Sequence, residues 1–332
     1  MVTKILLVID SKLTFSEAPP SRFLYIAKSV QEKNFEVEVI GRRGEKIKDL
    51  KTTQVSGTKN IARLKILLCT YAKAFSYPYS SILVRGGFLT FFLLPLKIFN
   101  RKVILDFHEW LFREIKVFYE KTLYNKLKVA FYYFVERMAT NYCSVIVCVS
   151  EGVRMLLGRE ERAKSIVLEN GLDTIESKRA GYEAEKEKEE IYSKYLIPKN
   201  KPLIGFLGNW ERQLDMETMF NGAKMAEVNM VVIGEGPKLD EFKKKWSNVI
   251  FTGRLPRFEA LKIIYLCDAT MVPYKGGYTF TSYYSQRKVK DYLGLGKPII
   301  MTDVREREGY LVPNRNVLLY EPGNAEDLAD KI

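Results

Sequence analysis

The chain has 332 residues, of which 47% are apolar and 28% are charged, with one His and four Cys. This composition is typical of a globular protein and excludes a disordered or fibrous chain. At roughly 150 residues per domain, the length predicts two domains. Because 53 Lys and Arg stand against 40 Asp and Glu, the formal charge is +13. Such a surface attracts nucleic acid, nucleotide phosphates or an anionic membrane.

The positive charge is concentrated in the first half of the sequence. Residues 1–175 carry 28 basic and 17 acidic side chains, a net charge of +11, whereas residues 176–332 carry 25 and 23, a net charge of +2. Between Asp49 and Asp106 there are nine basic residues and no acidic ones. We therefore expect a strongly positive face on the first half, with a set of solvated helix faces as the alternative.

Short apolar runs separated by helix-length segments predict an α/β domain in the first half. The runs span residues 4–9, 35–40, 81–85, 102–107, 144–150 and 165–170. The N-terminal run has too few apolar residues for a signal peptide and is expected to be a buried strand. Residues 88–99 are apolar but contain a Pro and a Lys, so we expect a core or interfacial helix there and not a membrane span.

Residues 116–142 mix Lys with Tyr and Phe. Basic residues interleaved with aromatic ones are typical of a helix that lies at an anionic membrane surface. A helix packed in the core is the alternative. The four cysteines form no CxxC pair and lie far from the sole histidine, His108. We therefore expect neither a zinc site nor a disulfide framework, and a reducing cytosolic compartment fits better.

The second half repeats the strand pattern more regularly, at residues 203–208, 230–236, 249–253, 269–273, 297–302 and 316–320. Several runs end at a glycine, where a parallel sheet presents backbone N–H groups and helix N-termini to a ligand. A charge-dense run at 183–190 is either a solvated helix or a linker and predicts a domain seam. The sequence therefore predicts Rossmann-like domains at 1–185 and 186–332, whose sheets face across a ligand-binding cleft.

The segment 285–303 carries the pattern with the most chemical content. Arg287 and Lys288 open a predicted amphipathic helix, Asp291 follows about one turn later, and Gly294 and Gly296 end the helix before a buried strand. A carboxylate in this position can accept hydrogen bonds from the diol of a ribose, and the cations can neutralise phosphate. An ordinary solvated helix face is the alternative.

Several segments occur in the order found in one known family. They read KVKDYLGLGKPII (288–300), LDFHEW (105–110), VSEGVRMLL (149–157), LENGLD (168–173), GFLGNWERQLDMETMFNGA (205–223), MVVIGEGP (230–237), NVIFTGRLP (248–256), CDATMVPY (267–274) and EPGNAEDLADKI (321–332). Together they resemble the retaining GT-B glycosyltransferases of the group 1, family 4-like type. The resemblance implies the GT-B fold, with an acceptor-side N-terminal domain, a nucleotide-sugar-binding C-terminal domain and a terminal crossover helix that is short or absent here.

The resemblance also implies roles for residues of the C-terminal domain. Asp291 replaces the ribose-binding Glu of the family, and Tyr283 stands where a second Glu touches the donor sugar. Hydroxyls of the same loop, such as that of Ser285, are expected to contact the sugar instead. Arg212 and Lys288 are the expected cations for the diphosphate. The other donor-binding residues implied in this way are Gly208, Asn209 and Arg254.

In the N-terminal domain the resemblance places His108 toward the donor sugar, with the adjacent Glu109 as the alternative residue and as a candidate on the acceptor side. His108 is expected to hydrogen-bond sugar or phosphate, with a purely structural histidine as the alternative. Arg22, in a loop with two prolines, is expected on the acceptor side, and a rigid connector is an equally good interpretation. Asp106 and Glu109 flank His108 within one motif, and we expect no metal site from them.

These implications define an expected function. The chain would be a retaining, hexosyltransferase-type glycosyltransferase that needs no metal or other cofactor. It would use a nucleoside-diphosphate sugar and a lipid-linked or glycan acceptor, and would bind the cytoplasmic face of an anionic membrane through its basic N-terminal domain. Two alternatives are a GT-B-like scaffold or regulator with weakened catalysis and, more distantly, a nucleic-acid-binding protein. A nucleic acid is not an expected partner, because no recognition motif is present.

Overall fold

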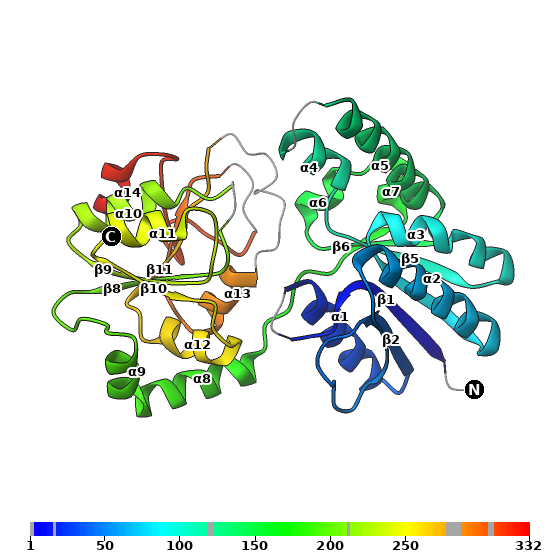
Figure 1. Cartoon of the computed structure of the whole chain (residues 1–332), viewed down its shortest axis with the longest axis horizontal. Coiled ribbons are helices and arrows are strands. Elements are labelled where there is room, and N and C mark those ends of the chain that lie inside the picture. The colour runs from blue at the N-terminus through cyan, green and yellow to red at the C-terminus, as the bar shows by residue number, and fades with distance from the viewer. Residues whose placement is uncertain (1–2, 16–17, 119–121, 211–212, 277–286, 305–308) are drawn as a thin grey trace. The chain divides into compact units, whose positions relative to one another are not determined.

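A computed structural model of the chain describes residues 3–15, 18–118, 122–210, 213–276, 287–304 and 309–332. The chain forms two compact units, unit 1 (residues 1–169) and unit 2 (residues 170–332), each built on one parallel sheet (Figure 1). The predicted α/β fold with two parallel sheets is confirmed. The division lies before helix α8 (Thr174–Lys186) and not at 185/186, because α8 packs against helix α12 (Arg257–Tyr265) of unit 2.

Unit 1 holds a seven-stranded sheet with the order β3-β2-β1-β4-β5-β6-β7. All its neighbouring strands are parallel. Six strands match the predicted runs, and the polar strand β3 at the sheet edge was not predicted, since KTTQV is not an apolar run. The strands are β1 (Lys4–Lys12), β2 (Glu36–Arg42), β3 (Lys51–Val55), β4 (Tyr79–Arg85), β5 (Lys102–Phe107), β6 (Val145–Cys148) and β7 (Ser165–Val167).

Helices cover both faces of this sheet. Alternate residues of β1 point to opposite sides, so Leu6 and Val8 pack with α2 and α3, whereas Leu7 and Ile9 pack with α1. The helices of unit 1 are α1 (Ala18–Gln31), α2 (Lys59–Ser76), α3 (Gly87–Leu93), the 3-10 helix η1 (Leu94–Phe99), α4 (Leu111–Phe118), α5 (Leu123–Tyr142), α6 (Glu151–Met155) and α7 (Arg159–Ala163).

The two segments expected to lie at an interface are helical. Residues 88–99 form α3 and then η1, and the change to 3-10 geometry coincides with Pro95 near the start of η1. Residues 116–142 form parts of two helices and not one. Thr122 caps the second helix, α5, by accepting a hydrogen bond from the Asn125 backbone N–H.

Unit 2 holds a six-stranded parallel sheet with the order β10-β9-β8-β11-β12-β13. All six strands fall on predicted apolar runs. They are β8 (Leu203–Leu207), β9 (Asn229–Ile233), β10 (Val249–Gly253), β11 (Ala269–Val272), β12 (Ile299–Thr302) and β13 (Val317–Tyr320). Besides α8 and α12, the helices are α9 (Lys188–Lys194), α10 (Met216–Met225), α11 (Leu239–Lys245), α13 (Arg287–Gly294) and α14 (Ala325–Lys331). The charged run 183–190 is therefore helical and lies inside unit 2.

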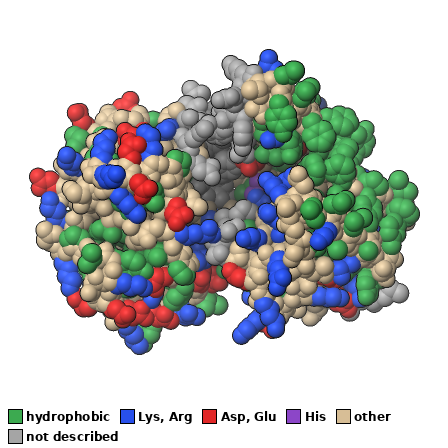
Figure 2. Space-filling model, in the orientation of Figure 1, with side chains coloured by type: hydrophobic (Ala, Val, Ile, Leu, Met, Phe, Trp, Pro, Cys, Tyr) green, Lys and Arg blue, Asp and Glu red, His purple; other side chains and the backbone are tan. Residues whose placement is uncertain are grey.

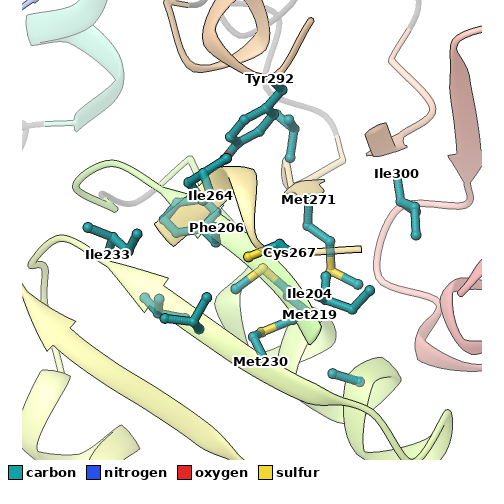
Figure 3. Close-up of a cluster of buried hydrophobic side chains, with 14 of the residues drawn as sticks. Ile204, Phe206, Met219, Met230, Ile233, Ile264, Cys267, Met271, Tyr292 and Ile300 are labelled. Atoms are coloured by element: carbon teal, nitrogen blue, oxygen red, sulfur yellow. The ribbon is translucent and has the colours of Figure 1, made fainter. Parts of the chain in front are cut away.

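The core of unit 2 is a single cluster of buried side chains from the sheet and both helix layers. Figure 1 shows α10, α11 and α14 on one face of this sheet and α8, α9 and α12 on the other. Figure 3 shows the centre of this core, with Phe206 of β8 beside Ile264 of α12 and Tyr292 of α13. The core thus holds α13 against the end of β8, where the sequence predicts the donor site.

Candidate functional site

A buried network of charged residues lies at the carboxyl ends of β4 and β5 in unit 1. The pairing of these two strands places Arg85 directly opposite Asp106. Asp106 is fully buried, and its Oδ1 accepts from Nε and Nη2 of Arg22 on α1, at 3.2 and 3.1 Å. Its Oδ2 lies 2.7 Å from Nε2 of His108, which in turn lies 3.1 Å from Nη1 of Arg85. Asp106 therefore links two arginines and the sole histidine.

The electrostatics of this network keep His108 neutral. Burial, together with the guanidinium groups of Arg85 and Arg22, outweighs the opposing effect of Asp106 and lowers the pKa of His108 to about 4. Burial raises the pKa of Asp106, but His108, Arg22 and Arg85 outweigh that effect and hold this pKa well below its usual range. Near neutral pH the site therefore holds a carboxylate, a neutral imidazole and two guanidinium groups.

The short contact with Asp106 also selects the tautomer of His108. A neutral imidazole can approach a carboxylate to 2.7 Å only by donating a hydrogen bond, so Nε2 carries the proton. Arg85 Nη1, which can only donate, then lies beside Nε2 without a hydrogen bond to it. Nδ1 then carries the lone pair, and it has no partner among the described residues. His108 can therefore accept one hydrogen bond through Nδ1 from a hydroxyl group of a ligand.

The other residues predicted in unit 1 lie around this network. Arg22 is buried and bonded to Asp106, so it supports the carboxylate in addition to any acceptor role. Glu109 follows His108 and is partly buried. Arg85 was not predicted. Arg85 is a charged residue at the end of an apolar run in the sequence. That position indicates a site residue only once β4 and β5 are known to be neighbouring strands.

In unit 2 three strands end at glycines that lie edge to edge. Gly208, Gly234 and Gly253 follow or end β8, β9 and β10 and all have positive φ, at 125°, 141° and 71°. The Gly208 N–H donates to the Ile233 carbonyl at 2.9 Å, and the Gly234 N–H donates to the Gly253 carbonyl at the same distance. A Cβ at Gly234 would lie 2.4 Å from the Gly208 carbonyl oxygen. Only glycines allow the loops to approach this closely.

The end of β8 is open on the side of β11. These strands pair only at Ala269 with Ile204 and at Thr270 with Gly205, so they separate toward their carboxyl ends. The Leu207 N–H, which lacks a strand partner on that side, donates to the Tyr292 hydroxyl at 2.8 Å. Parallel sheets bind ligands at such a change of strand order.

Lys288 reaches this opening from the first turn of α13. A Cβ at Gly208 would lie 3.2 Å from its Nζ, and Nζ lies 4.4 Å from the centre of the Phe206 ring. Burial lowers the pKa of Lys288 to about 8. Its ammonium group makes no ion pair or hydrogen bond with any described residue. A partly buried cation without a counter-ion, beside a glycine-rich strand end, is suited to an anion.

Asp291 has a strong partner within unit 2. Both its oxygens accept from Arg257, at 2.9 and 2.8 Å, and Arg257 also donates to Glu176 of α8 at 2.8 Å. Burial lowers the pKa of Arg257, but the two carboxylates outweigh this effect and raise it. The carboxylate expected to bind ribose is therefore bonded to an arginine, and Arg257 lacked any distinctive sequence signal. A ribose diol would have to use the remaining lone pairs of Asp291 or displace Arg257.

The remaining predicted donor residues have different placements. Asn209 lies beside the glycine loops and accepts from the Glu235 N–H at 3.1 Å, whereas Arg254 follows β10 and is exposed. The predicted residues Arg212, Tyr283 and Ser285 lie outside the described residues.

Two searches of the described residues concern metals and membranes. No three His, Cys, Asp or Glu side chains gather closely enough to hold a metal ion in this part of the chain. Within the same residues, no helix has the length and apolar character needed to cross a membrane.

Comparison with known proteins adds a family model and a set of solved structures. Residues 201–332, which lie within unit 2, match the model of glycosyl transferases group 1. No curated protein matches the chain. Among similar solved structures, the UDP complex of Anabaena Alr3699/HepE has a TM-score of 0.66 and 14% sequence identity, and the match covers 99% of this chain and 88% of that one. Sucrose-phosphate synthase from Thermosynechococcus elongatus has a TM-score of 0.71 and 14% identity, with 99% and 88% covered. WaaG, a glycosyltransferase involved in lipopolysaccharide biosynthesis, has a TM-score of 0.67 and 13% identity, with 98% and 88% covered.

These likenesses extend over both units and define the class of fold. The chain has the α/β fold with two parallel sheets of the GT-B type, as the sequence predicts. More particularly, its residues 201–332 match the family model of glycosyl transferases group 1.

Proposed function

We propose that the chain is a glycosyltransferase that transfers a hexose from a nucleoside-diphosphate sugar held by unit 2. The observation that carries the proposal is the ammonium group of Lys288, which lies beside Gly208 without a counter-ion among the described residues. The group 1 domain at 201–332 supports it. So do the structures of Anabaena HepE with UDP and with UDP-glucose, which have the same fold.

In the proposed reaction the bond between the sugar and the diphosphate breaks, and negative charge develops on the leaving group. Lys288 would neutralise that charge, with Arg212 as a second cation and the backbone N–H of Asn209 as a further donor. His108 would accept a hydrogen bond from a sugar hydroxyl through Nδ1. We further propose that the anomeric configuration is retained and that no metal is required.

On the acceptor side we propose a lipid-linked or glycan acceptor that is used at the cytoplasmic face of an anionic membrane. The positive charge of residues 1–175 supports this part of the proposal. The acceptor would be bound by unit 1, where Arg22 and Glu109 lie beside His108.

Nucleotide binding tests the donor site directly. In a thermal-shift panel of nucleoside diphosphates and nucleotide sugars, a cognate ligand is expected to raise the melting temperature, because it binds only the folded protein. Lys288→Met should make the binding free energy of that ligand less favourable by about 1.5–3 kcal/mol, the contribution of a charge-assisted hydrogen bond. Lys290→Met, on the same helix, is the matched control and should bind as the wild type does. Equal affinity in the two variants would remove Lys288 from the site.

The pH dependence of binding gives a sharper test. Since the pKa of Lys288 is lowered to about 8 and a bound diphosphate would raise it, the ammonium form is lost from the free protein above pH 8. Affinity should therefore fall about tenfold per pH unit above 8, and binding near pH 8.5 should take up a proton, as measured calorimetrically in two buffers. The Lys288→Met variant should show neither effect.

Activity distinguishes the enzyme from its alternatives. Slow hydrolysis of the cognate nucleotide sugar to nucleoside diphosphate by the purified protein is expected. Nucleotide-sugar binding without any hydrolysis or transfer would favour the scaffold. Salt-sensitive binding to DNA or RNA with no nucleotide-sugar affinity would favour the nucleic-acid-binding protein.

A further inference from the structure

Unit 1 carries a continuous apolar surface on α2, α3, η1 and α5, which we call the apolar face. Large side chains on all four elements are exposed. They are Leu64, Leu68 and Phe75 of α2, Phe92 of α3, Ile98 and Phe99 of η1, and Leu127, Phe131, Phe134 and Tyr142 of α5. Figure 2 shows the hydrophobic side chains gathered over α3 and α5 of unit 1. A contiguous exposed apolar surface of this kind marks an interaction site.

Ring contacts show that the four elements form one surface. Phe75 of α2 lies 4.9 Å from Phe99 of η1, measured between ring centroids. Phe91 of α3 lies 5.9 Å from Phe134 of α5. These contacts tie α2 to η1 and α3 to α5, and η1 follows α3 directly in the chain, so the exposed groups belong to one face.

An open pocket of about 730 Å³ lies within the apolar face. Its lining comes from all four elements and includes Leu67, Tyr71, Phe91, Pro95, Ile98 and Met138. The one charged side chain in the lining is Lys97, whose ammonium group donates to the Tyr142 carbonyl at 2.6 Å. The volume is within the range of about 300–1,000 Å³ that holds small ligands, and a lining that is mostly apolar suits a hydrocarbon chain.

The charge of the apolar face selects the occupant. Helices α2, α3, η1 and α5 contain a single acidic residue, Glu136. Glu136 is buried, and its carboxylate accepts hydrogen bonds from the backbone N–H groups of Leu111 and Phe112 at the start of α4. The exposed charge on these elements is therefore positive, which complements anionic lipid headgroups.

A protein partner fits this surface less well. The cores of protein interfaces are depleted in lysine, whereas Lys65 of α2, Lys97 of η1 and Lys126 of α5 alternate with the exposed apolar groups. Lysines placed in this way extend their alkyl stems along apolar surface and hold the ammonium group at the lipid headgroups. Exposed tyrosines and phenylalanines are likewise suited to the boundary between headgroups and hydrocarbon.

We propose that the apolar face docks unit 1 on an anionic lipid bilayer and that its pocket receives one hydrocarbon chain of a bilayer lipid. The inference deepens the proposed function and rests on it for the identity of the acceptor. It names the elements that meet the membrane and assigns the pocket between them.

Vesicle co-sedimentation tests the docking face. The full chain should bind vesicles of phosphatidylcholine and phosphatidylglycerol more strongly than vesicles of phosphatidylcholine alone. Ile98 is 83% exposed and Ile175 of unit 2 is 80% exposed, so Ile98→Asp and Ile175→Asp are matched changes with little effect on folding. Ile98→Asp should reduce binding about tenfold or more, and Ile175→Asp should not. Equal binding by the two variants would overturn the proposal.

A charge pair tests the electrostatic part in the same assay. Lys126 of α5 and Lys178 of α8 are both exposed. Lys126→Glu should weaken binding to the anionic vesicles by about fivefold per unit of charge removed, whereas Lys178→Glu should leave binding unchanged. An equal loss in both variants would show attraction by net charge alone and would count against a defined face.

Depth of insertion tests the pocket. A Trp is introduced in two variants, Ile98→Trp and Ile175→Trp, and each is mixed with vesicles whose lipid acyl chains carry bromine, which quenches Trp fluorescence. In Ile98→Trp the quenching should exceed that of the three native Trp residues in the wild type. In Ile175→Trp it should not exceed that background. Parinaric acid, a fluorescent fatty acid, should bind the wild type saturably at one equivalent. The absence of both signals would overturn the assignment of the pocket.

Two further outcomes separate this inference from its rivals and from the proposed function. A dimer in sedimentation equilibrium that Ile98→Asp abolishes, with no binding to vesicles, would assign the face to a second copy of the chain and overturn the proposal. Vesicle binding needs no nucleotide. Vesicle binding with no affinity for any nucleotide sugar would therefore support the inference and contradict the proposed function. Nucleotide-sugar binding with no vesicle binding would support the proposed donor site and overturn the inference.

Discussion

At the scale of single residues, His108 offers a direct probe of unit 1, because it is the only histidine in the chain. The imidazole should be the Nε2–H tautomer, since Nε2 donates to Asp106. Its pKa of about 4 lies below the ordinary 6.5 because burial and two arginines disfavour the charged form. A nitrogen-15 NMR titration should therefore show one imidazole that stays neutral until the pH approaches 4. A midpoint near 6.5, or a proton on Nδ1, would contradict the geometry of the network.

The same titration has a consequence for stability. Between pH 6.5 and 4 the unfolded chain protonates its histidine while the folded chain does not, so this group makes folding less favourable as the pH falls through that range. The destabilisation that arises from His108 reaches its full value below pH 4, where the imidazole is charged in both the folded and the unfolded chain. Unit 1 is thus stabilised at neutral pH by keeping His108 uncharged.

Asp106 is the residue whose removal should be most costly. Asp106→Asn removes the carboxylate that bonds Arg22 and attracts Arg85, and it removes the charged acceptor that sets the His108 tautomer. We expect a loss of about 3–5 kcal/mol in the free energy of unfolding, the usual cost of breaking a buried ion pair. Urea unfolding measures it.

The matched control for Asp106 is an exposed pair in the same unit. Glu151 bonds Arg154 at 2.9 Å, and its side chain is 60% exposed. Glu151→Gln should therefore cost less than about 1 kcal/mol. Similar losses in the two variants would show that the buried network contributes no more than a surface pair does.

Single residues with a motif of their own could be named from the sequence, whereas their bonding partners could not. His108, Lys288 and Asp291 are recognisable because each lies in a short motif of its own. Their partners Arg85 and Arg257 come from other elements, and only the pairing of β4 with β5 and the packing of α12 bring them close. Contacts between distant segments depend on strand order and helix packing, which a local pattern does not contain.

At the scale of elements, the glycines at the strand ends of unit 2 hold the loops together. Gly234→Ala would place a Cβ 2.4 Å from the Gly208 carbonyl oxygen, at a φ of 141° that alanine rarely adopts. We expect a loss of about 2–4 kcal/mol in urea unfolding, from backbone strain and the contact with the Gly208 loop. Gly171→Ala, where a Cβ meets nothing within 4 Å, is the control and should be nearly neutral. Equal effects would mean that the loops can separate freely.

The sheets were more predictable than their edges. A strand that is buried on both faces must be an apolar run, so the central strands are evident in the sequence. The edge strand β3 has polar side chains and was missed. The segment 116–142 was expected as a single helix, but α4 and α5 are separate and Thr122 caps the second one. Capping hydrogen bonds set the boundaries of such helices, and the pattern of hydrophobic residues does not show where these bonds form.

At the scale of the whole molecule, the two units have separate cores. The buried residues of the core cluster of unit 2 all lie between Ala180 and Leu328. The buried residues of the two core clusters of unit 1 all lie at or before Val147. We therefore expect residues 170–332 to fold when expressed alone. Circular dichroism with a cooperative thermal transition is the measurement.

A shorter piece is the control for that prediction. Residues 186–332 lack nearly all of α8, so Arg257 loses Glu176 and the core loses Ala180. This piece should melt at a lower temperature than 170–332. If both pieces melted alike, α8 would contribute nothing to unit 2, and the boundary at 185/186 expected from the charged run would be equally good.

The hydrogen bond from the Leu207 N–H to the Tyr292 hydroxyl couples a strand end to a helix. Tyr292 lies one turn after Lys288 on α13, so a ligand that displaces α13 must either carry this hydroxyl with it or break the bond. Ligand affinity and the opening of this bond are then linked, and each changes the other by the same factor. Hydrogen exchange of the Leu207 amide therefore reports on the opening of this bond and on any displacement of α13 from the end of β8.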